Sequence, residues 1–191
     1  MIHDHSSQDH RIHTGDCGCA AEAMAGFLSR RRLLVLGAGA ALAGLIPVPG
    51  MAATGEYEAM LVSCIDPRFV AEVHTYMGGR GMKGQYSQFV IAGGPAAIAA
   101  PAFADWHKAF WDNLAATIQL HNIKKVVGLT HRDCGAVKIA YGEAAVSDPA
   151  KETAKHKEIL ANFRTQVGQR QPKLGVETGI MALGGAVEMI A

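Results

Sequence analysis

The sequence has 191 residues, of which 49% are hydrophobic and 18% are charged. Its 18 basic and 17 acidic side chains leave a formal net charge of +1, which argues against a nucleic-acid-binding surface and against intrinsic disorder. Four cysteines are too few for a disulfide-stapled miniature fold. No apolar run reaches the roughly 18 residues of a membrane span. The composition therefore predicts a globular domain that binds no nucleic acid and has no stable membrane span.

The first 53 residues have the pattern of an export signal. Three arginines (30–32) directly precede an apolar, glycine-rich and alanine-rich stretch over 33–46, which two prolines end. This order is typical of a secretory signal peptide, and the paired arginines resemble the twin-arginine type. A membrane anchor or a buried helix is the alternative, but the run is short and ends abruptly. We expect a leader over 1–53, a mature catalytic domain over 54–191, and export to the periplasm by the twin-arginine route.

Strand-like and helix-like stretches alternate along the predicted mature domain. Short apolar runs bounded by turn residues predict buried strands, and apolar residues at helical spacing predict amphipathic helices. This alternation predicts an α/β fold with a mostly parallel β-sheet flanked by helices and a C-terminal strand pair, with the chemistry at the carboxyl ends of the strands. The expected strands span 59–65, 88–92, 125–130, 176–183 and 186–190; the expected helices span 66–76, 103–118 and 135–141 and a later stretch around 159–167, with a flexible glycine loop at 78–84.

Two cysteines remain in the predicted mature domain, and each lies at the end of a predicted strand. Cys64 begins Cys-Ile-Asp-Pro-Arg (64–68), and Cys134 ends His-Arg-Asp-Cys (131–134). Two thiolates and one imidazole form a Cys2His set, which recurs in catalytic zinc sites with an open fourth position. The start of a helix after Cys134 also favours its thiolate. A closed structural zinc site needs four ligands, usually from paired Cys-x-x-Cys units, which the sequence lacks.

These residues resemble those of the β-class carbonic anhydrases. The Cys-x-Asp-x-Arg box matches at Cys64, Asp66 and Arg68, and the His-x-x-Cys-Gly box begins at His131 and includes Cys134. The resemblance implies a zinc ion (Zn2+) held by Cys64, His131 and Cys134, with a hydroxide in the fourth position. The implied activity is that of a carbonic anhydrase (carbonate dehydratase), the reversible hydration of carbon dioxide to bicarbonate and a proton. Asp66 would orient the hydroxide and Arg68 would hold Asp66, which becomes a fourth ligand if that pair breaks.

Two features depart from the family pattern. Residues 90–95 are Val-Ile-Ala-Gly-Gly-Pro, where the family usually carries an Arg-Asn-Ala-Gly/Ala-Asn-like segment that helps to build the pocket and dimer contacts. After the expected cleavage, only residues 54–58 would precede the first strand, which is too few for the helical arm typical of the family. A homodimer or higher homo-oligomer is still expected, because edge strands and apolar helix faces need cover.

Several interpretations remain open at this level. Carbonyl sulfide and carbon disulfide hydrolases share this fold and these ligands, so the substrate could differ. A closed site with Asp66 as a fourth zinc ligand would be non-catalytic. Alternatively, Cys64 and Cys134 could form a disulfide or act as a thiol–disulfide pair. Asp66 also suits a helix N-cap, Arg68 a surface position and His131 a structural role. Four histidines are expected to be mostly solvated helix residues or to serve as proton shuttles: His74, His107, His121 and His156. Three aromatic residues are expected in the core or at a subunit interface: Trp106, Phe110 and Trp111.

Overall fold

The computed structural model describes residues 55–191, and the predicted export signal lies outside the described residues. Within this part, a five-stranded sheet has four strands in parallel and a last strand that pairs antiparallel at one edge. The predicted mostly parallel α/β fold with a C-terminal strand pair is therefore confirmed. The strands are β1 (Ala59–Ser63), β2 (Tyr86–Val90), β3 (Lys125–His131), β4 (Gly175–Met181) and β5 (Val187–Ile190), in the spatial order β2-β1-β3-β4-β5.

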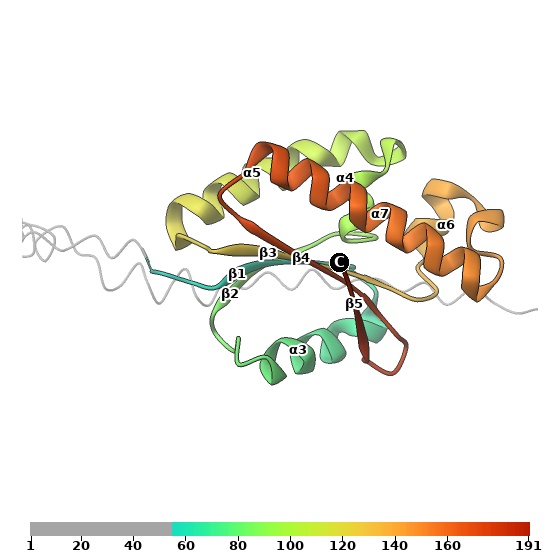
Figure 1. Cartoon of the computed structure of the whole chain (residues 1–191), viewed down its shortest axis with the longest axis horizontal. Coiled ribbons are helices and arrows are strands. Elements are labelled where there is room, and N and C mark those ends of the chain that lie inside the picture. The colour runs from blue at the N-terminus through green and yellow to red at the C-terminus, as the bar shows by residue number, and fades with distance from the viewer. Residues whose placement is uncertain (1–54) are drawn as a thin grey trace, which may run out of the picture. The chain divides into compact units, whose positions relative to one another are not determined.

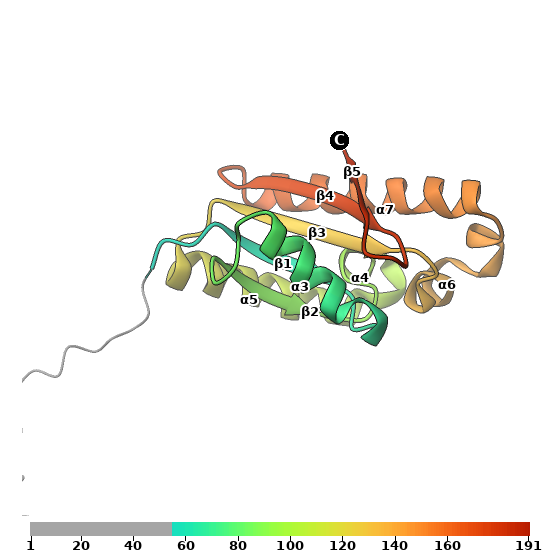
Figure 2. The same ribbon diagram turned by 90° about the horizontal axis from the view of Figure 1, so that it is seen from below.

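Helices cover both faces of the sheet. The longer helices are α3 (Val70–Gly79), α4 (Pro95–Ala99), α5 (Ala104–His121), α6 (Gly135–Tyr141) and α7 (Pro149–Arg170), and the short 3-10 turns are η1 (Pro67–Phe69), η2 (Pro101–Phe103) and η3 (Glu143–Val146). Helix α3 lies on one face, and α4, α5 and α7 lie on the other (Figures 1 and 2). None of the helices within residues 55–191 has the length and the apolar character that a membrane crossing requires.

The interior strand β1, which lies between β2 and β3, is buried along its whole length. Its alternate side chains enter two separate cores: Met60 and Val62 pack with α4, α5 and α7, whereas Ala59 and Leu61 pack with α3. A parallel strand covered on both faces has a continuous apolar sequence, which is the pattern at 59–62. The carboxyl end of β1 is thus fixed from both sides, and the functional side chains follow directly after it.

Most predicted elements are observed within a few residues of their expected bounds, and three of the differences have clear physical causes. Helix α3 continues through two glycines to Gly79 instead of ending at Tyr76, so the turn that follows uses Gly81 and Gly84, both with φ of +73°. Strand β2 occupies 86–90 and not 88–92, because its pairing with β1 sets its register. Helix α4 was not predicted, since a five-residue helix is too short to show an apolar period.

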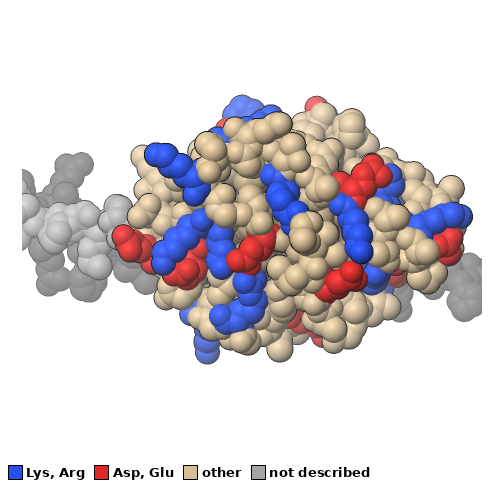
Figure 3. All heavy atoms as spheres, viewed as in Figure 1, with Lys and Arg blue, Asp and Glu red and all other residues tan. Residues whose placement is uncertain are grey.

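Charged side chains of both signs are spread over the surface. On the face shown in Figure 3, Lys and Arg side chains lie interspersed with Asp and Glu side chains. Ion pairs also join segments that are far apart in the sequence, such as Lys124 with Glu58 and Arg80 with Glu177. Such mixed charge follows from the near-equal numbers of basic and acidic residues in the sequence.

Candidate metal centre

The two sequence boxes meet at the carboxyl ends of adjacent strands. Strands β1 and β3 pair directly, so Cys64, just after β1, comes close to His131, the last residue of β3. Cys134 follows in the same loop and is the N-cap of α6. One ligand atom from each of these three side chains lies within 4.8 Å of the other two. The fold therefore brings together the three residues that the sequence analysis proposed as metal ligands.

The imidazole of His131 is held in one orientation and one tautomer. Its Nδ1 lies 2.8 Å from the carbonyl oxygen of Arg132, and because a carbonyl only accepts, Nδ1 carries the proton. In the neutral ring, Nε2 then keeps its lone pair. This atom is buried and has no hydrogen-bond partner among residues 55–191, and the ring packs on Phe69 with centroids 4.1 Å apart. An oriented ring with a buried, unpartnered lone pair is the arrangement that a metal-binding histidine requires.

The two cysteines are free thiols that interact with each other. The Cys134 side chain hydrogen-bonds Cys64 and lowers the pKa of Cys64 to about 4; burial opposes this shift, and the backbone N–H of Gly93, 3.1 Å from the Cys64 Sγ atom, assists it. The same contact, together with burial, raises the pKa of Cys134, although N–H groups at the start of α6 act in the opposite direction. The two thiols thus share one negative charge more readily than two, and the N–H groups at the start of α6 favour the thiolate of Cys134 as the sequence suggested.

Asp66 and Arg68 form a paired unit at the edge of this cluster. Arg68 donates from Nε to Asp66 Oδ1 (3.0 Å) and from Nη2 to Asp66 Oδ2 (2.8 Å). These hydrogen bonds, opposed by partial burial, lower the pKa of Asp66 to about 2. The Oδ2 atom is also 4.0 Å from His131 Nε2, so the carboxylate borders the space that the three ligand atoms surround.

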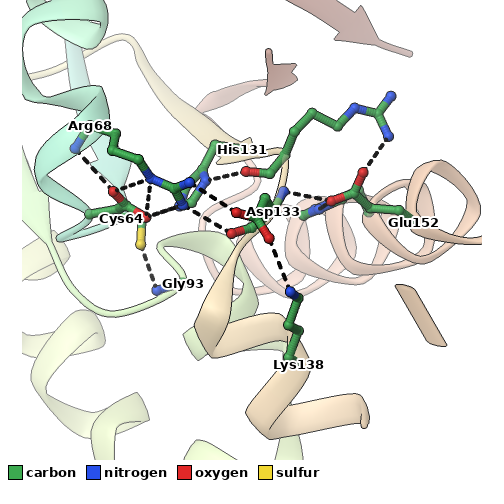
Figure 4. A network of polar contacts seen from close by, with 10 residues as sticks. Cys64, Arg68, Gly93, His131, Asp133, Lys138 and Glu152 are labelled. Atoms are coloured by element: carbon green, nitrogen blue, oxygen red, sulfur yellow. Dashed lines mark hydrogen bonds and ion pairs between the residues drawn. The ribbon is translucent and has the colours of Figure 1, made fainter. Parts of the chain in front are cut away.

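Asp133 is a second partner of Arg68 that the sequence analysis missed. Arg68 Nη1 donates to Asp133 Oδ2 (2.9 Å), Arg68 Nη2 donates to the Asp133 carbonyl oxygen (3.1 Å), and Lys138 donates to Asp133 Oδ1 (3.0 Å). Figure 4 shows these groups converging on the loop between His131 and Cys134. Asp133 lies within the His131–Cys134 motif, but an aspartate at this position does not by itself indicate that Arg68 is its partner.

The other predicted candidates lie apart from this cluster or in the core. His74 contacts the Tyr86 hydroxyl, and His121 contacts the Ser87 hydroxyl. The expectation of a solvated side chain is wrong for His156, which is fully buried on α7. Among the aromatics, Phe110 is buried in the core, whereas Trp106 is partly exposed and stacks on Phe103.

The donor chemistry of the cluster suits a metal ion. Two sulfur atoms and one imidazole nitrogen form a set that favours zinc and other thiophilic transition metals over magnesium or calcium. The buried, unpartnered Nε2 atom of His131 and the lowered pKa of Cys64 fit such a cation, since a metal ligand must be deprotonated. Cys64, His131 and Cys134 would hold the ion, and Asp66 lies beside them.

Solved structures place the fold among the β-carbonic anhydrases. The alignment with the crystal structure of the β-carbonic anhydrase CafA of Aspergillus fumigatus covers 88% of this chain and 90% of the CafA chain, with a TM-score of 0.50 and 16% sequence identity. A structure from work on two tetrameric β-carbonic anhydrases of Sordaria macrospora covers 85% and 98% of the two chains, with a TM-score of 0.47 and 16% identity. The chain has a β-carbonic-anhydrase-like fold.

Two rickettsial proteins are more similar in sequence. The uncharacterized protein RC0076 of Rickettsia conorii is 35% identical over 135 residues, which cover 71% of this chain and 73% of that protein. An uncharacterized protein of Rickettsia bellii is 33% identical over 135 residues, covering 71% and 82%. No family model matches the chain. The chain belongs to the same family as these two rickettsial proteins.

Proposed function

We propose that this protein is a zinc-dependent carbonic anhydrase that interconverts carbon dioxide with bicarbonate and a proton. The observation that carries the proposal is the cluster of Cys64, His131 and Cys134, whose ligand atoms lie within 4.8 Å of one another. The paired Asp66 and Arg68 beside it and the β-carbonic-anhydrase-like fold support the same assignment. When bound, zinc would act as a Lewis acid and lower the pKa of a water molecule bound to it to near 7.

The chain's own residues would orient the reacting water. Asp66, ionised at neutral pH because its pKa is about 2, can only accept a hydrogen bond and so would fix the direction of a water O–H. Arg68 occupies both carboxylate oxygens of Asp66 and thereby restrains Asp66 from approaching the ligand atoms. This pairing favours an open site over the non-catalytic alternative in which Asp66 is a fourth ligand.

The decisive experiment is stopped-flow hydration of carbon dioxide by the purified, zinc-loaded protein between pH 6.5 and 9, a range that brackets the expected pKa of the water. We expect hydration that increases with pH and that a chelator abolishes. The matched control is His131→Ala, which should lose zinc and activity together. Zinc bound tightly without any hydration would refute the proposal and direct the search to carbonyl sulfide and carbon disulfide, or to a zinc-binding protein without catalysis.

We also propose that the protein is exported, with residues 1–53 as a twin-arginine-type signal peptide and the periplasm as the destination. The support is the arginine pattern at 30–32 before a short apolar run. Residues 1–53 fused to a folded reporter should direct it to the periplasm. Replacing all three arginines by lysine keeps the charge and should stop export; unchanged export would refute the twin-arginine route.

A further inference from the structure

The loop that carries two of the three candidate ligands depends on contacts from outside itself. Between His131 and Cys134 lie only Arg132 and Asp133, and Asp133 has a φ of +56°, a left-handed conformation that L-residues other than glycine seldom adopt. The hydrogen bonds of the Asp133 side chain with Arg68 and Lys138 lie at the surface, where the Asp133 side chain is 51% exposed. Contacts of this kind contribute little to holding a backbone.

Helix α7 supplies further contacts, from a side chain that is less exposed than that of Asp133. Glu152, in the first turn of α7, accepts a hydrogen bond from the backbone N–H of Asp133 at 2.6 Å through Oε1. Its Oε2 atom accepts from Arg132 Nη1 at 3.3 Å, and the same Nη1 donates to Thr153 Oγ1 at 2.6 Å. Both residues between the two ligands are thus tied to α7, as Figure 4 shows for Glu152.

The surroundings of Glu152 leave its carboxylate few other positions. Its side chain is only 15% exposed, and its Oε1 atom lies 3.9 Å from the ring of the fully buried His156. The hydrogen bond to the Asp133 N–H is short and charge-assisted, so it ranks among the stronger contacts of the loop. The carboxylate that borders the space among the three ligand atoms is that of Asp66, whereas Glu152 contacts the loop between the ligands. Glu152 therefore has no direct role in the proposed reaction.

We propose that Glu152 is a positioning residue that fixes the His131–Cys134 loop and so sets the affinity and the coordination geometry of the metal site. The inference rests on the proposed function, since it assumes a metal at Cys64, His131 and Cys134. Glu152 acts through the backbone of Asp133 and not by touching the metal. Groups that orient metal ligands in this way typically change metal affinity 10- to 100-fold when removed.

The test compares Glu152→Ala and Glu152→Gln with Glu158→Ala in the full-length protein. Glu158 lies on the same helix, is 64% exposed and, within the described part of the chain, pairs only with Lys155, so it controls for loss of a carboxylate on α7. Zinc affinity is measured by competition with a chromophoric chelator, and the site geometry is measured by the absorption spectrum of the cobalt(II)-substituted protein.

We expect Glu152→Ala to weaken zinc binding 10- to 100-fold and to alter the cobalt(II) spectrum at saturation. Glu152→Gln keeps one acceptor oxygen for the Asp133 N–H but loses the charge and the Oε2 contact with Arg132, so its zinc affinity should lie between those of Glu152→Ala and the wild type. Glu158→Ala should match the wild type. Wild-type affinity and spectrum in Glu152→Ala would overturn the inference, as would equal losses in the Gln and Ala variants. If the wild-type protein itself bound no zinc, the proposed function would fail as well.

Discussion

Asp66 combines two roles through the same carboxylate. Its Oδ1 atom accepts from the backbone N–H of Arg68 and caps the η1 turn, and it also accepts from the Arg68 guanidinium. The backbone turn therefore places Arg68 in the position from which its side chain returns to Asp66. The resemblance to the β-class carbonic anhydrases implied this pair, and the structure shows that the local turn and the distant Asp133 both hold Arg68 in place.

Replacing Asp66 separates its orienting role from metal binding. We expect Asp66→Asn to retain zinc, because the three ligands are unchanged, and to lower turnover 10- to 100-fold, because an amide can also donate and no longer fixes the direction of the water. Zinc content by elemental analysis and carbon dioxide hydration by stopped flow provide the measurements. Turnover equal to the wild type would rule out an orienting role.

Gly94 illustrates how backbone packing shapes the site. It has a φ of +54°, and a Cβ atom there would lie 2.9 Å from the carbonyl carbon of Ser63 and 3.1 Å from the backbone nitrogen of Cys64. Gly81 has a φ of +73° but open space around the equivalent position, which makes it a control. Both glycines have a positive φ, but Gly94 also has a ψ of −120°, outside the left-handed helical region, so the two differ in backbone conformation as well as in steric crowding.

We expect Gly81→Ala to cost about 1–2 kcal/mol of unfolding free energy from backbone strain. Gly94→Ala should cost about 1–3 kcal/mol more, because the added methyl group also displaces the chain at Cys64. Urea denaturation of both variants and the wild type measures the difference. Equal losses in the two variants would show that the close approach at Gly94 is not tight.

The sequence identified the site residues whose side-chain chemistry is distinctive. Thiols, an imidazole and an Asp–Arg pair at strand ends point to a metal, and the structure brings them together. The sequence did not reveal the hydrogen bond from the Gly93 N–H to the Cys64 sulfur or the one from the Asp133 N–H to the Glu152 carboxylate. Backbone donors exist at almost every residue, and an acidic residue in a helix is usually solvated, so neither contact leaves a signal in the sequence.

At the scale of elements, the sequence predicted strands better than helix ends. Strands β1 and β3 are buried on both faces, so their continuous apolar sequences located them well. The ends of α3 and α4 depend instead on tertiary contacts: Gly79 stays helical, and α4 is a five-residue segment buried against α5 and α7. Burial of that kind is decided by neighbours that lie far away along the chain.

Helix α7 contains a buried histidine that should make the fold sensitive to acid. Burial lowers the pKa of His156 to about 4, against the opposing attraction of Glu152 and with help from Arg132 and His131. The unfolded chain, with an ordinary histidine pKa near 6.5, binds the proton first as pH falls. Stability is therefore complete above about pH 6.5 and is lost progressively as pH falls towards 4.

The variant His156→Leu should flatten this dependence, since the buried group that resists protonation is gone. The wild type should lose up to about 3 kcal/mol between pH 6.5 and 4 relative to this variant. Denaturant unfolding at several pH values measures the difference, and His74→Leu, which replaces an exposed histidine on α3, serves as the control. Parallel pH profiles for the wild type and His156→Leu would contradict the prediction.

At the scale of the whole molecule, strand β2 forms one edge of the sheet in the part of the chain that the structure describes. Strand β2 pairs with β1 on one side only, and Val90 at its end is 47% exposed. Unpaired edges and exposed apolar side chains favour association between chains. We expect the protein to be a homodimer or a higher homo-oligomer.

Light scattering after size-exclusion chromatography should give a mass of at least two chains. A lysine at the edge of β2 disfavours pairing, so Val90→Lys should shift the protein towards the monomer. Lys83→Ala, at a position before β2, provides a control that should leave the mass unchanged. A monomeric wild type at micromolar concentration would exclude this mode of association.

The ligand set is divided between two distant parts of the chain, which has a consequence for the order of events during folding. Arg68 and Asp133, which flank the site, are 65 residues apart in sequence and meet only because β1 and β3 pair. Bringing such distant segments together is a slow, entropically costly step of folding. Before that step, the complete set of three ligands is not available to a metal ion, so metal binding should follow pairing of β1 with β3. The rate of metal binding during refolding should therefore report the rate at which these two strands pair.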